Sequence, residues 1–180
     1  HYTGSESVTS MPATAVDWVL VELRSGTASS TSIDTVAALL LSDGSVVSHT
    51  DGASPLAFFT ATPGDYHIVV HHRNHLSIIS SVTHTLSQGS STLYDFTTAS
   101  TQSYGGASAL YGHTDGSWCM FATDGNSDNQ TTATDNSIWQ IDNGSTNVFL
   151  QSDFNMDGQV SSSDNVFWQE NNGNTSKVPY

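Results

Sequence analysis

Hydrophobic and polar residues alternate along the first half of the chain, in short runs that turn residues separate. Within residues 16–24, Val19, Val21 and Leu23 fall on one side of an extended chain, and mixed residues fall on the other. A period of two residues is typical of a half-buried β-strand. We therefore predict a strand at this place.

The apolar runs that follow predict further strands joined by tight turns. Asp43-Gly44 and Asp51-Gly52 are strong turn signals, and Pro63-Gly64-Asp65 is a third. Residues 25–35 and 99–117 are predicted to be loops, and no strong amphipathic helix is expected before residue 133. The further expected strands are 36–41, 46–47, 56–59, 66–72, 76–86 and 92–98.

The last third of the chain contains one pattern twice. Residues 124–140 reappear as residues 153–169, at a constant offset of 29 residues. In both copies acidic or amide side chains stand at positions 1, 3, 5 and 12, and a hydroxyl group stands at position 9. This is the pattern of a twelve-residue calcium loop.

The spacing follows from what calcium requires, which is about six to eight oxygen ligands. Positions 1, 3 and 5 supply side chains, position 7 a backbone carbonyl, position 9 often a water contact, and position 12 a closing carboxylate. Two ions would move the net charge from −14 to about −10. The predicted ligands are Asp124, Asn126, Asp128, Gln130, Thr132 and Asp135 in the first loop, and Asp153, Asn155, Asp157, Gln159, Ser161 and Asp164 in the second.

Position 6 of such a loop needs a positive φ angle. Gly158 adopts it freely and Asn129 is the next most tolerant choice, so the second site is expected to be the better formed. The alternative is a pair of Asx-rich turns, because Asp, Asn and Gly are the commonest turn residues. The duplication favours calcium. It also places Trp139 and Trp168 one helical turn after each last ligand, where they can pack two short helices together.

The paired loops, each ending in Asp and followed by a short helix, resemble a dockerin. They are especially similar to the dockerin-like ends of large secreted proteins of Bacteroidetes-type bacteria. The resemblance covers about residues 120–177. It departs from the family pattern at Asn129, which replaces the loop glycine, and in its short, polar helices.

Residues 16–100 resemble a second family. The stretches VLVELR, LLLSDGSVVSHTDG and LAFFTATPGDYHIVVHHRNHL are similar to the prealbumin-like β-sandwiches of bacterial surface adhesins, which implies a fold but no chemistry. The predicted fold class is mainly β, with a prealbumin- or immunoglobulin-like β-sandwich before a small dockerin-like pair of calcium loops with short helices. The predicted division is an arm at 1–15, a sandwich at 16–117, a calcium-loop segment at 118–172 and a tail at 173–180.

The chain is strongly acidic, with three Lys and Arg residues against 17 Asp and Glu residues. Such a surface repels nucleic acid and anionic lipid, and it attracts divalent cations. No apolar run approaches the length of a membrane span. Cys119 is the single cysteine, so no intramolecular disulfide can form, and its apolar neighbours predict a buried residue. A surface rich in Ser, Thr, Asn and Gly is typical of secreted bacterial surface proteins, so an extracellular location is expected.

Histidines cluster near the end of the strand expected at 66–72. His67 and His71 would lie about 13 Å apart on a strand, too far to share one ion, and no third ligand accompanies His72 and His75. We interpret these side chains as structural. The segment Arg73-Asn74-His75 is expected to fix the loop after the strand by hydrogen bonds.

No nucleophile elbow, phosphate loop or zinc signature is present, so a non-enzymatic protein is predicted. The expected function is a secreted, calcium-binding structural or adhesive surface module. Its expected partners are other cell-surface proteins or copies of itself, which polar arms at 1–15 and 171–180 would join into a filament. One alternative is a carbohydrate-binding or cohesin-docking accessory module of a polysaccharide-degrading system, with Tyr104, Tyr111 and Trp118 as the candidate surface. Another is a copper monooxygenase that uses His1.

Overall fold

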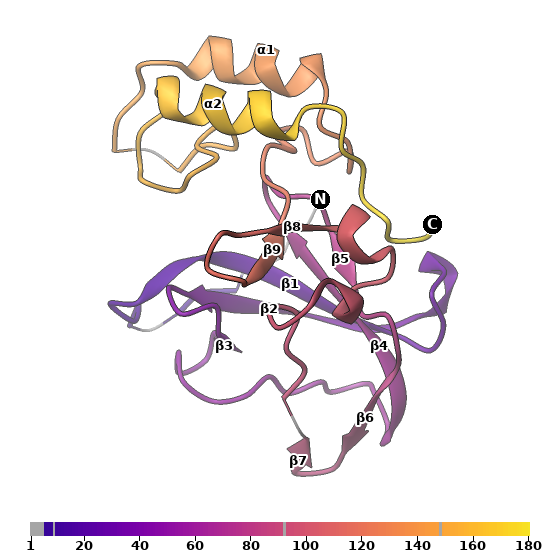
Figure 1. The fold of residues 1–180 in the computed structure, drawn as a ribbon. Coiled ribbons are helices and arrows are strands. Elements are labelled where there is room, and N and C mark those ends of the chain that lie inside the picture. Colours follow the sequence, from indigo (N-terminus) through magenta and orange to yellow (C-terminus); the bar gives the residue numbers. More distant parts are fainter. Residues whose placement is uncertain (1–5, 9, 92, 148) are drawn as a thin grey trace.

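The computed structural model describes residues 6–8, 10–91, 93–147 and 149–180. It is mainly β, with antiparallel strands and two short helices that lie side by side beyond one end of the sheet (Figure 1). The helices are α1 (Ala133–Asp142) and α2 (Ser162–Asn171). The strands are β1 (Ala15–Arg24), β2 (Ser32–Leu41), β3 (Val46–Ser48), β4 (Gly64–His72), β5 (Ile78–Ile79), β6 (His84–Ser87), β7 (Ser90–Ser91), β8 (Leu110–Gly112) and β9 (Trp118–Met120).

The main sheet has the strand order β3-β2-β1-β4-β6-β7, and β5 also pairs with β4. Its register explains the alternation in the sequence. Val21 of β1 stands opposite Val36 of β2 and opposite Val70 of β4, so that valines from three neighbouring strands share one face. Residues directly opposite in an antiparallel pair point to the same side of the sheet, and this side becomes the core.

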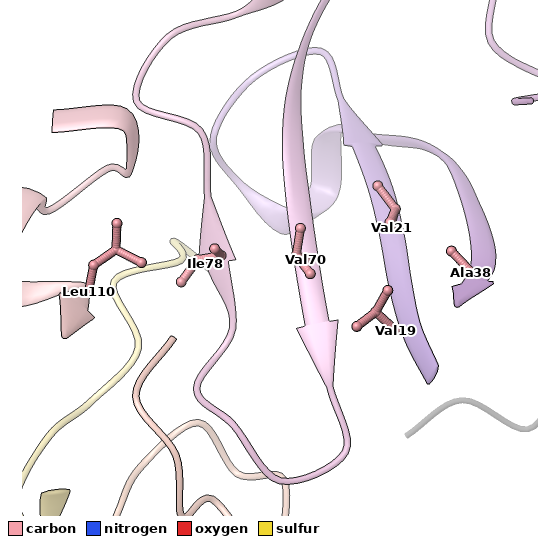
Figure 2. Packing of buried hydrophobic residues seen from close by; sticks show 6 residues of the cluster. All are labelled: Val19, Val21, Ala38, Val70, Ile78 and Leu110. Atoms are coloured by element: carbon pink, nitrogen blue, oxygen red, sulfur yellow. The ribbon is translucent and has the colours of Figure 1, made fainter. Parts of the chain in front are cut away.

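The hairpin of β8 and β9 packs against this apolar cluster, and Figure 2 shows its Leu110 beside Ile78. Leu110, which is 1% exposed, packs in one cluster with Val19, Val21, Val70 and Ile78. Trp118 and Met120 of β9 pack against the same cluster. The fold therefore has two layers, in which the second layer is a two-stranded hairpin with loops.

Most of the strands expected from periodicity are confirmed, with changed boundaries. β1, β3 and β4 lie where they were predicted. β2 begins at Ser32, inside the expected loop 25–35, because the second half of β1 offers it a partner and Leu23 stands opposite Asp34. The region 76–86 forms two short strands, β5 and β6, in place of one.

Three strand and loop predictions are wrong. Residues 56–59 form no strand: Leu56 and Phe58 pack against the core from an irregular segment, and Phe59 is 89% exposed. Residues 93–98 also form no strand, and residue 92 lies outside the described residues. Residues 99–117 are more than a loop, because they contain β8 and two short 3-10 turns, Ser100–Gln102 and Gly106–Ser108.

The strand β9 corrects a further prediction. It lies within the segment assigned to the calcium loops, yet it pairs with β8 and so packs with the sheet. Cys119 is exposed on β9, where a buried residue was expected. Side chains alternate along a strand, so the core-facing neighbours Trp118 and Met120 direct Cys119 away from the core.

The C-terminal tail returns to the sheet. Ser176 Oγ donates to the carbonyl of Ser77 at 2.7 Å, and Arg24 Nη1 donates to the carbonyl of Pro179 at 3.0 Å. The tail therefore packs on its own chain, and the expected role of residues 171–180 in joining copies of the chain stays a prediction. In the described part of the chain, no helix has the length and apolar character that crossing a membrane requires.

Candidate metal centre

The first loop closes around Asp124. One carboxylate oxygen of Asp124 accepts the N–H of Asp128 at 2.9 Å, and the other accepts the N–H of Asn129 at 2.9 Å. Asn126 Oδ1 accepts the N–H of Asp128 at 3.1 Å, and Asp128 Oδ1 accepts the N–H of Gln130 at 2.9 Å. The side-chain oxygens at positions 1, 3 and 5 are thus held against the backbone of one tight loop.

The second loop repeats this network at the 29-residue offset. Asp153 accepts the N–H groups of Asp157 at 3.1 Å and Gly158 at 3.0 Å. Asn155 Oδ1 accepts the N–H of Asp157 at 3.0 Å, and Asp157 Oδ1 accepts the N–H of Gln159 at 2.9 Å. The repeat in the sequence is therefore a repeat in three dimensions.

The aspartates at position 12 are fully buried and cap the helices. Asp164 Oδ1 accepts the N–H of Asn155 at 3.1 Å, and Asp164 Oδ2 accepts the N–H of Ser161 at 2.8 Å. Ser161 and Asp164 form a capping box for α2, and Thr132 and Asp135 form the same box for α1. Position 9 of each loop is thus the N-cap of a helix, and position 12 lies in the first turn of that helix.

Positive φ angles occur at the same positions in both loops. Position 6 has φ 64° at Asn129 and 83° at Gly158, as expected. Position 4 has φ 58° at Ser127 and 61° at Met156. A non-glycine residue in this region costs about 1–2 kcal/mol, so the first loop, with two such residues, is the more strained. That the second site binds better stays a prediction.

Each motif is completed by the other. Trp139 Nε1 on α1 donates to the carbonyl of Ser161 at 2.7 Å, and Trp168 Nε1 on α2 donates to the carbonyl of Thr132 at 2.8 Å. Both acceptors are N-cap residues of the opposite helix. The two tryptophans therefore join the helices, as expected, and they do so by hydrogen bonds that obey the same 29-residue offset.

Short backbone pairings fix the carbonyl at position 7. Gln130 stands opposite Thr175, and the bonds Thr131 N–H to Asn174 O and Ser176 N–H to Asn129 O flank this pair, each at 2.9 Å. In such a pair the N–H and C=O of the central residue both point away from the partner segment. The Gln130 carbonyl therefore points to the loop side. Thr146 and Gln159 form the equivalent bridge for the second loop.

The electrostatics of both loops disfavour bare carboxylates. Burial raises the pKa of Asp124 to about 7, and the charges of Asp135 and Asp128 add to this, against the lowering effect of backbone N–H donors. Burial, with the charge of Asp164, also raises the pKa of Asp153. A divalent cation bound in each loop would oppose both shifts, because a nearby positive charge favours the ionised carboxylate.

The donor set fits a hard cation. A carboxylate has about four lone-pair sites, and each oxygen of Asp124 accepts one backbone N–H, which leaves room for a metal. Among the described residues, no three side chains of His, Cys, Asp or Glu lie together so that they could hold a metal ion by themselves. A calcium loop needs amide and carbonyl oxygens as well, which Asn126 and Gln130 supply in the first loop and Asn155 and Gln159 in the second.

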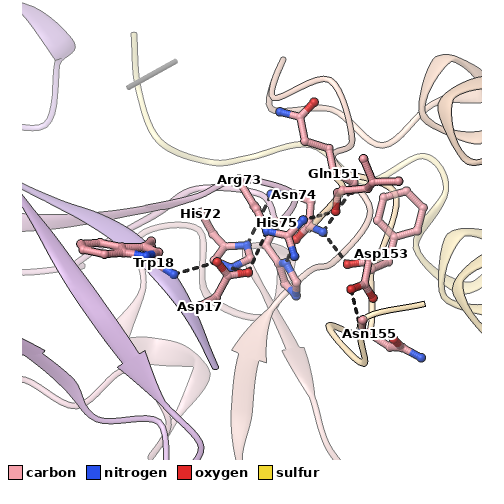
Figure 3. Close-up of polar contacts among 12 residues, drawn as sticks. Asp17, Trp18, His72, Arg73, Asn74, His75, Gln151, Asp153 and Asn155 are labelled. Atoms are coloured by element: carbon pink, nitrogen blue, oxygen red, sulfur yellow. Dashed lines mark hydrogen bonds and ion pairs between the residues drawn. The ribbon is translucent and has the colours of Figure 1, made fainter. Parts of the chain in front are cut away.

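Asn74, in the turn after β4, contacts both loops, and Figure 3 shows its side chain beside Gln151 and Asp153 at the second loop. It is fully buried. Its side-chain Nδ2 donates to the carbonyls of Gln151 at 3.0 Å and Asp153 at 2.7 Å. Its own backbone carbonyl accepts the N–H groups of Thr123 at 2.9 Å and Asp124 at 3.0 Å. The expected hydrogen-bonding role of this turn is confirmed, but its partners in the two loops were not foreseen.

Arg73 ties the same turn to the sheet. Its Nε donates to Asp17 Oδ2 at 2.8 Å, and Asp17 is buried at the start of β1. Its guanidinium lies 4.0 Å from the ring centre of Phe149 and donates through Nη1 to the carbonyl of Leu150. Its backbone carbonyl accepts Ser127 Oγ at 2.8 Å. One residue thus contacts β1, the first loop and the segment that leads into the second.

The histidines are engaged with groups of the sheet. His72 Nε2 lies 3.2 Å from Asp17 Oδ2, and the rings of His72 and His75 meet edge to face at 4.6 Å. His71 Nε2 lies 3.1 Å from Glu22 Oε2. Although burial favours the neutral acid, hydrogen bonds from His71 and Arg24 lower the pKa of Glu22 to about 2. His71 and His72 are therefore partners of the buried carboxylates Glu22 and Asp17 of the sheet.

The other candidate sites are less complete. Trp118 packs in the core, so only Tyr104 and Tyr111 of the proposed aromatic surface are exposed, at 46% and 39%. His1, the proposed copper ligand, lies outside the described residues.

No family model matches the chain, and no curated protein matches it. Among solved structures, it is similar to a chain of an N-terminal interface mutant of the type II cohesin–X-dockerin complex from Acetivibrio cellulolyticus. The identity is 14%, the coverage is 93% of this chain and 90% of that one, and the TM-score is 0.51. A C-terminal interface mutant of the same complex matches with 14% identity, 94% and 93% coverage and a TM-score of 0.46. At this identity the first likeness shows a shared fold alone, a mainly antiparallel β architecture.

Proposed function

We propose that this protein is a non-catalytic extracellular interaction module whose C-terminal unit is built around two calcium ions. The observation that carries the proposal is the repeated network at Asp124 and Asp153, in which twelve-residue loops with the same hydrogen bonds hold buried aspartates of raised pKa. Helix capping accounts for the buried aspartates at position 12, but Asx turns alone do not account for a buried aspartate at position 1 of both loops.

Calcium would be held by all-oxygen sets, one for each loop. The bound ion would supply two positive charges to balance the carboxylates of each loop, in a chain that has few Lys and Arg residues. Asp135 and Asp164 cap the N-termini of α1 and α2. Trp139 and Trp168 each donate a hydrogen bond from one helix to the N-cap residue of the other. Metal binding is thereby coupled to the order of the whole unit.

The partner of the module is another extracellular protein or a second copy of this chain. A mainly β fold shared with a chain of a docking complex supports this class of function. Sizing by light scattering, with calcium and with chelator, tests self-association. A single monomer mass under both conditions would exclude the filament role and leave a foreign protein as the partner.

Thermal unfolding tests the calcium role. A ligand that binds only the folded state at 100 times its Kd stabilises it by about 2.7 kcal/mol, so the Tm should rise with calcium and fall with chelator. The double variant Asp128→Ala, Asp157→Ala should lose this response. Asp43→Ala, which removes an exposed acid from the turn between β2 and β3, should retain it. Equal Tm values for the wild type with calcium and with chelator would contradict the proposal.

A further inference from the structure

The two loops share one anchor in the sheet domain. The backbone carbonyl of Asn74 accepts two N–H groups at the start of the first loop, from Thr123 and Asp124. The side-chain amide of Asn74 donates to two carbonyls at the start of the second loop, from Gln151 and Asp153. The first ligand residue of each loop is therefore bonded to the same buried residue.

This arrangement has two separable halves. When the first loop is ordered, its two N–H groups fix the peptide that follows the Asn74 Cα atom. The side chain on that Cα atom is then directed at the second loop, where the backbone carbonyl oxygen of Asp153 lies 2.7 Å from Asn74 Nδ2. An ordered second loop fixes the same side chain from its other end. Each loop therefore reduces the conformational freedom that the other loses on binding an ion.

Neighbouring contacts strengthen the anchor on both sides. Two residues of the first loop also bond to the neighbourhood of Asn74. Asn129 Oδ1 accepts the N–H of Ser77 at 3.3 Å, and Ser127 Oγ donates to the carbonyl of Arg73. Arg73 also donates to the carbonyl of Leu150, which precedes the second loop. Asn74 is the residue of this turn that bonds directly to the first ligand residue on both sides.

We propose that Asn74 is a positioning residue that couples the two loops, so that an ion in one loop raises the affinity of the other. The inference rests on the proposed calcium function. Coupling of this kind is reciprocal, so each ion should change the affinity of the other loop by the same factor. Typical coupling between protein sites spans about 5- to 150-fold in affinity.

Calorimetric calcium titration of single-loop variants tests the coupling. Asp157→Ala leaves the first loop intact and Asp128→Ala leaves the second, and both replaced residues are exposed, so the fold is retained. Each remaining loop should bind its ion at least about fivefold more weakly than in the wild type. The titrations are run at physiological ionic strength, where the Debye length of about 8 Å limits direct repulsion between the sites.

Replacement of the anchor completes the test. In Asn74→Ala the affinity of each loop should no longer depend on whether the other loop is intact. Asn172→Ala removes the same side chain from an exposed position at the end of α2 and should leave the coupling unchanged. Independent loops in the wild type, or coupling that persists in Asn74→Ala, would overturn the inference while leaving calcium binding in place. A wild type that binds no calcium would overturn the proposed function itself.

Hydrogen exchange supplies a readout that does not depend on affinity. In Asp157→Ala with calcium, only the first loop is loaded. The amides of residues 150–160 should then become more protected when Asn74 is present, and they should stay unchanged in Asn74→Ala. Exchange in the sheet strands shows whether Asn74→Ala is folded. Protection that appears equally in both backgrounds would contradict the role of Asn74.

Discussion

The sheet domain and the paired-loop unit differ in the side chains that they bury, and the contrast is the reason we propose a metal for one of them only. In the sheet domain the fully buried side chains include Leu23, Leu39 and Val69, which are apolar. In the paired-loop unit, residues 124–175, the buried side chains include Asp124, Asp135, Asp153 and Asp164. Apolar burial stabilises a fold without further help, whereas buried carboxylates are costly unless they are paired.

Buried charge in the sheet domain has partners on the chain itself. Glu22 lies 2.9 Å from Arg24 Nη2, and Asp17 lies 2.8 Å from Arg73 Nε. In the paired-loop unit, the described residues provide the aspartates with backbone N–H donors and hydroxyl groups, and no Lys or Arg forms an ion pair with the ligand set there. The missing positive charge is what calcium would bring.

The largest expected effect is the loss of stability when a core side chain of the sheet domain is shortened. Leu39→Ala in the sheet should lower the free energy of unfolding by about 2–5 kcal/mol, because it leaves a cavity at a fully buried position. This loss should be the same with calcium and with chelator, as denaturant titration can measure. Val82→Ala, at a 60% exposed position, is the control and should cost little. A loss that appears only with calcium would mean that the sheet also depends on the metal.

A smaller expected effect is that stability depends on pH in opposite directions in the two regions. A carboxyl whose folded-state pKa is raised stabilises the fold below its unfolded pKa, and this contribution is lost as pH rises through the folded value. For Asp124 the loss should therefore extend from about pH 4 to about pH 7 when calcium is absent. Glu22 has the opposite sign, because its pKa is lowered to about 2, and its contribution is lost as pH falls below about 4.5.

Asp124→Asn tests this sign. With chelator at pH 8, it should stabilise the protein by about 1–3 kcal/mol, because removing the buried charge gains about 1.4 kcal/mol for each pKa unit, whereas the amide NH2 group loses one of the two acceptors of backbone N–H groups. With calcium it should destabilise the protein, because a ligand is lost. Asp43→Asn, at an exposed acid whose pKa is lowered by the Ser45 backbone N–H, should not stabilise it under either condition. Destabilisation by Asp124→Asn in chelator would show that the carboxylate is satisfied without a metal.

The smallest effect concerns the internal symmetry of the paired-loop unit. Trp139→Phe and Trp168→Phe each remove one indole donor, and each should cost about 1 kcal/mol of stability. Because the two bonds are equivalent, the two losses should agree. Trp18→Phe is the matched control in the sheet domain. Strongly unequal losses at 139 and 168 would show that the two halves of the unit are not energetically equivalent.

The sequence predicts features whose determinants are local. The alternation of Val19, Val21 and Leu23 marks β1, and the ligand spacing marks loops that close within twelve residues. The apolar run around Cys119 predicts a buried residue, but its side chain is exposed because side chains alternate along a strand.

Long-range contacts could not be predicted in the same way. The side chain of Asn74 bonds to carbonyls 77 and 79 residues further along the chain, and the residue looks like an ordinary turn asparagine in the sequence. The return of the tail to Ser77 and Arg24 likewise depends on backbone carbonyls as acceptors, and these carry no sequence signal. A fully buried Asn is the structural feature that identifies such an anchor.

We propose that each loop of the paired-loop unit holds one calcium ion. The most direct measurement is the number of calcium ions that remain bound per chain after equilibrium dialysis, determined by elemental analysis. Two ions are predicted for the wild type, one each for Asp128→Ala and Asp157→Ala, and none for the double variant. A wild-type chain that retains no calcium at saturating concentration would contradict the account.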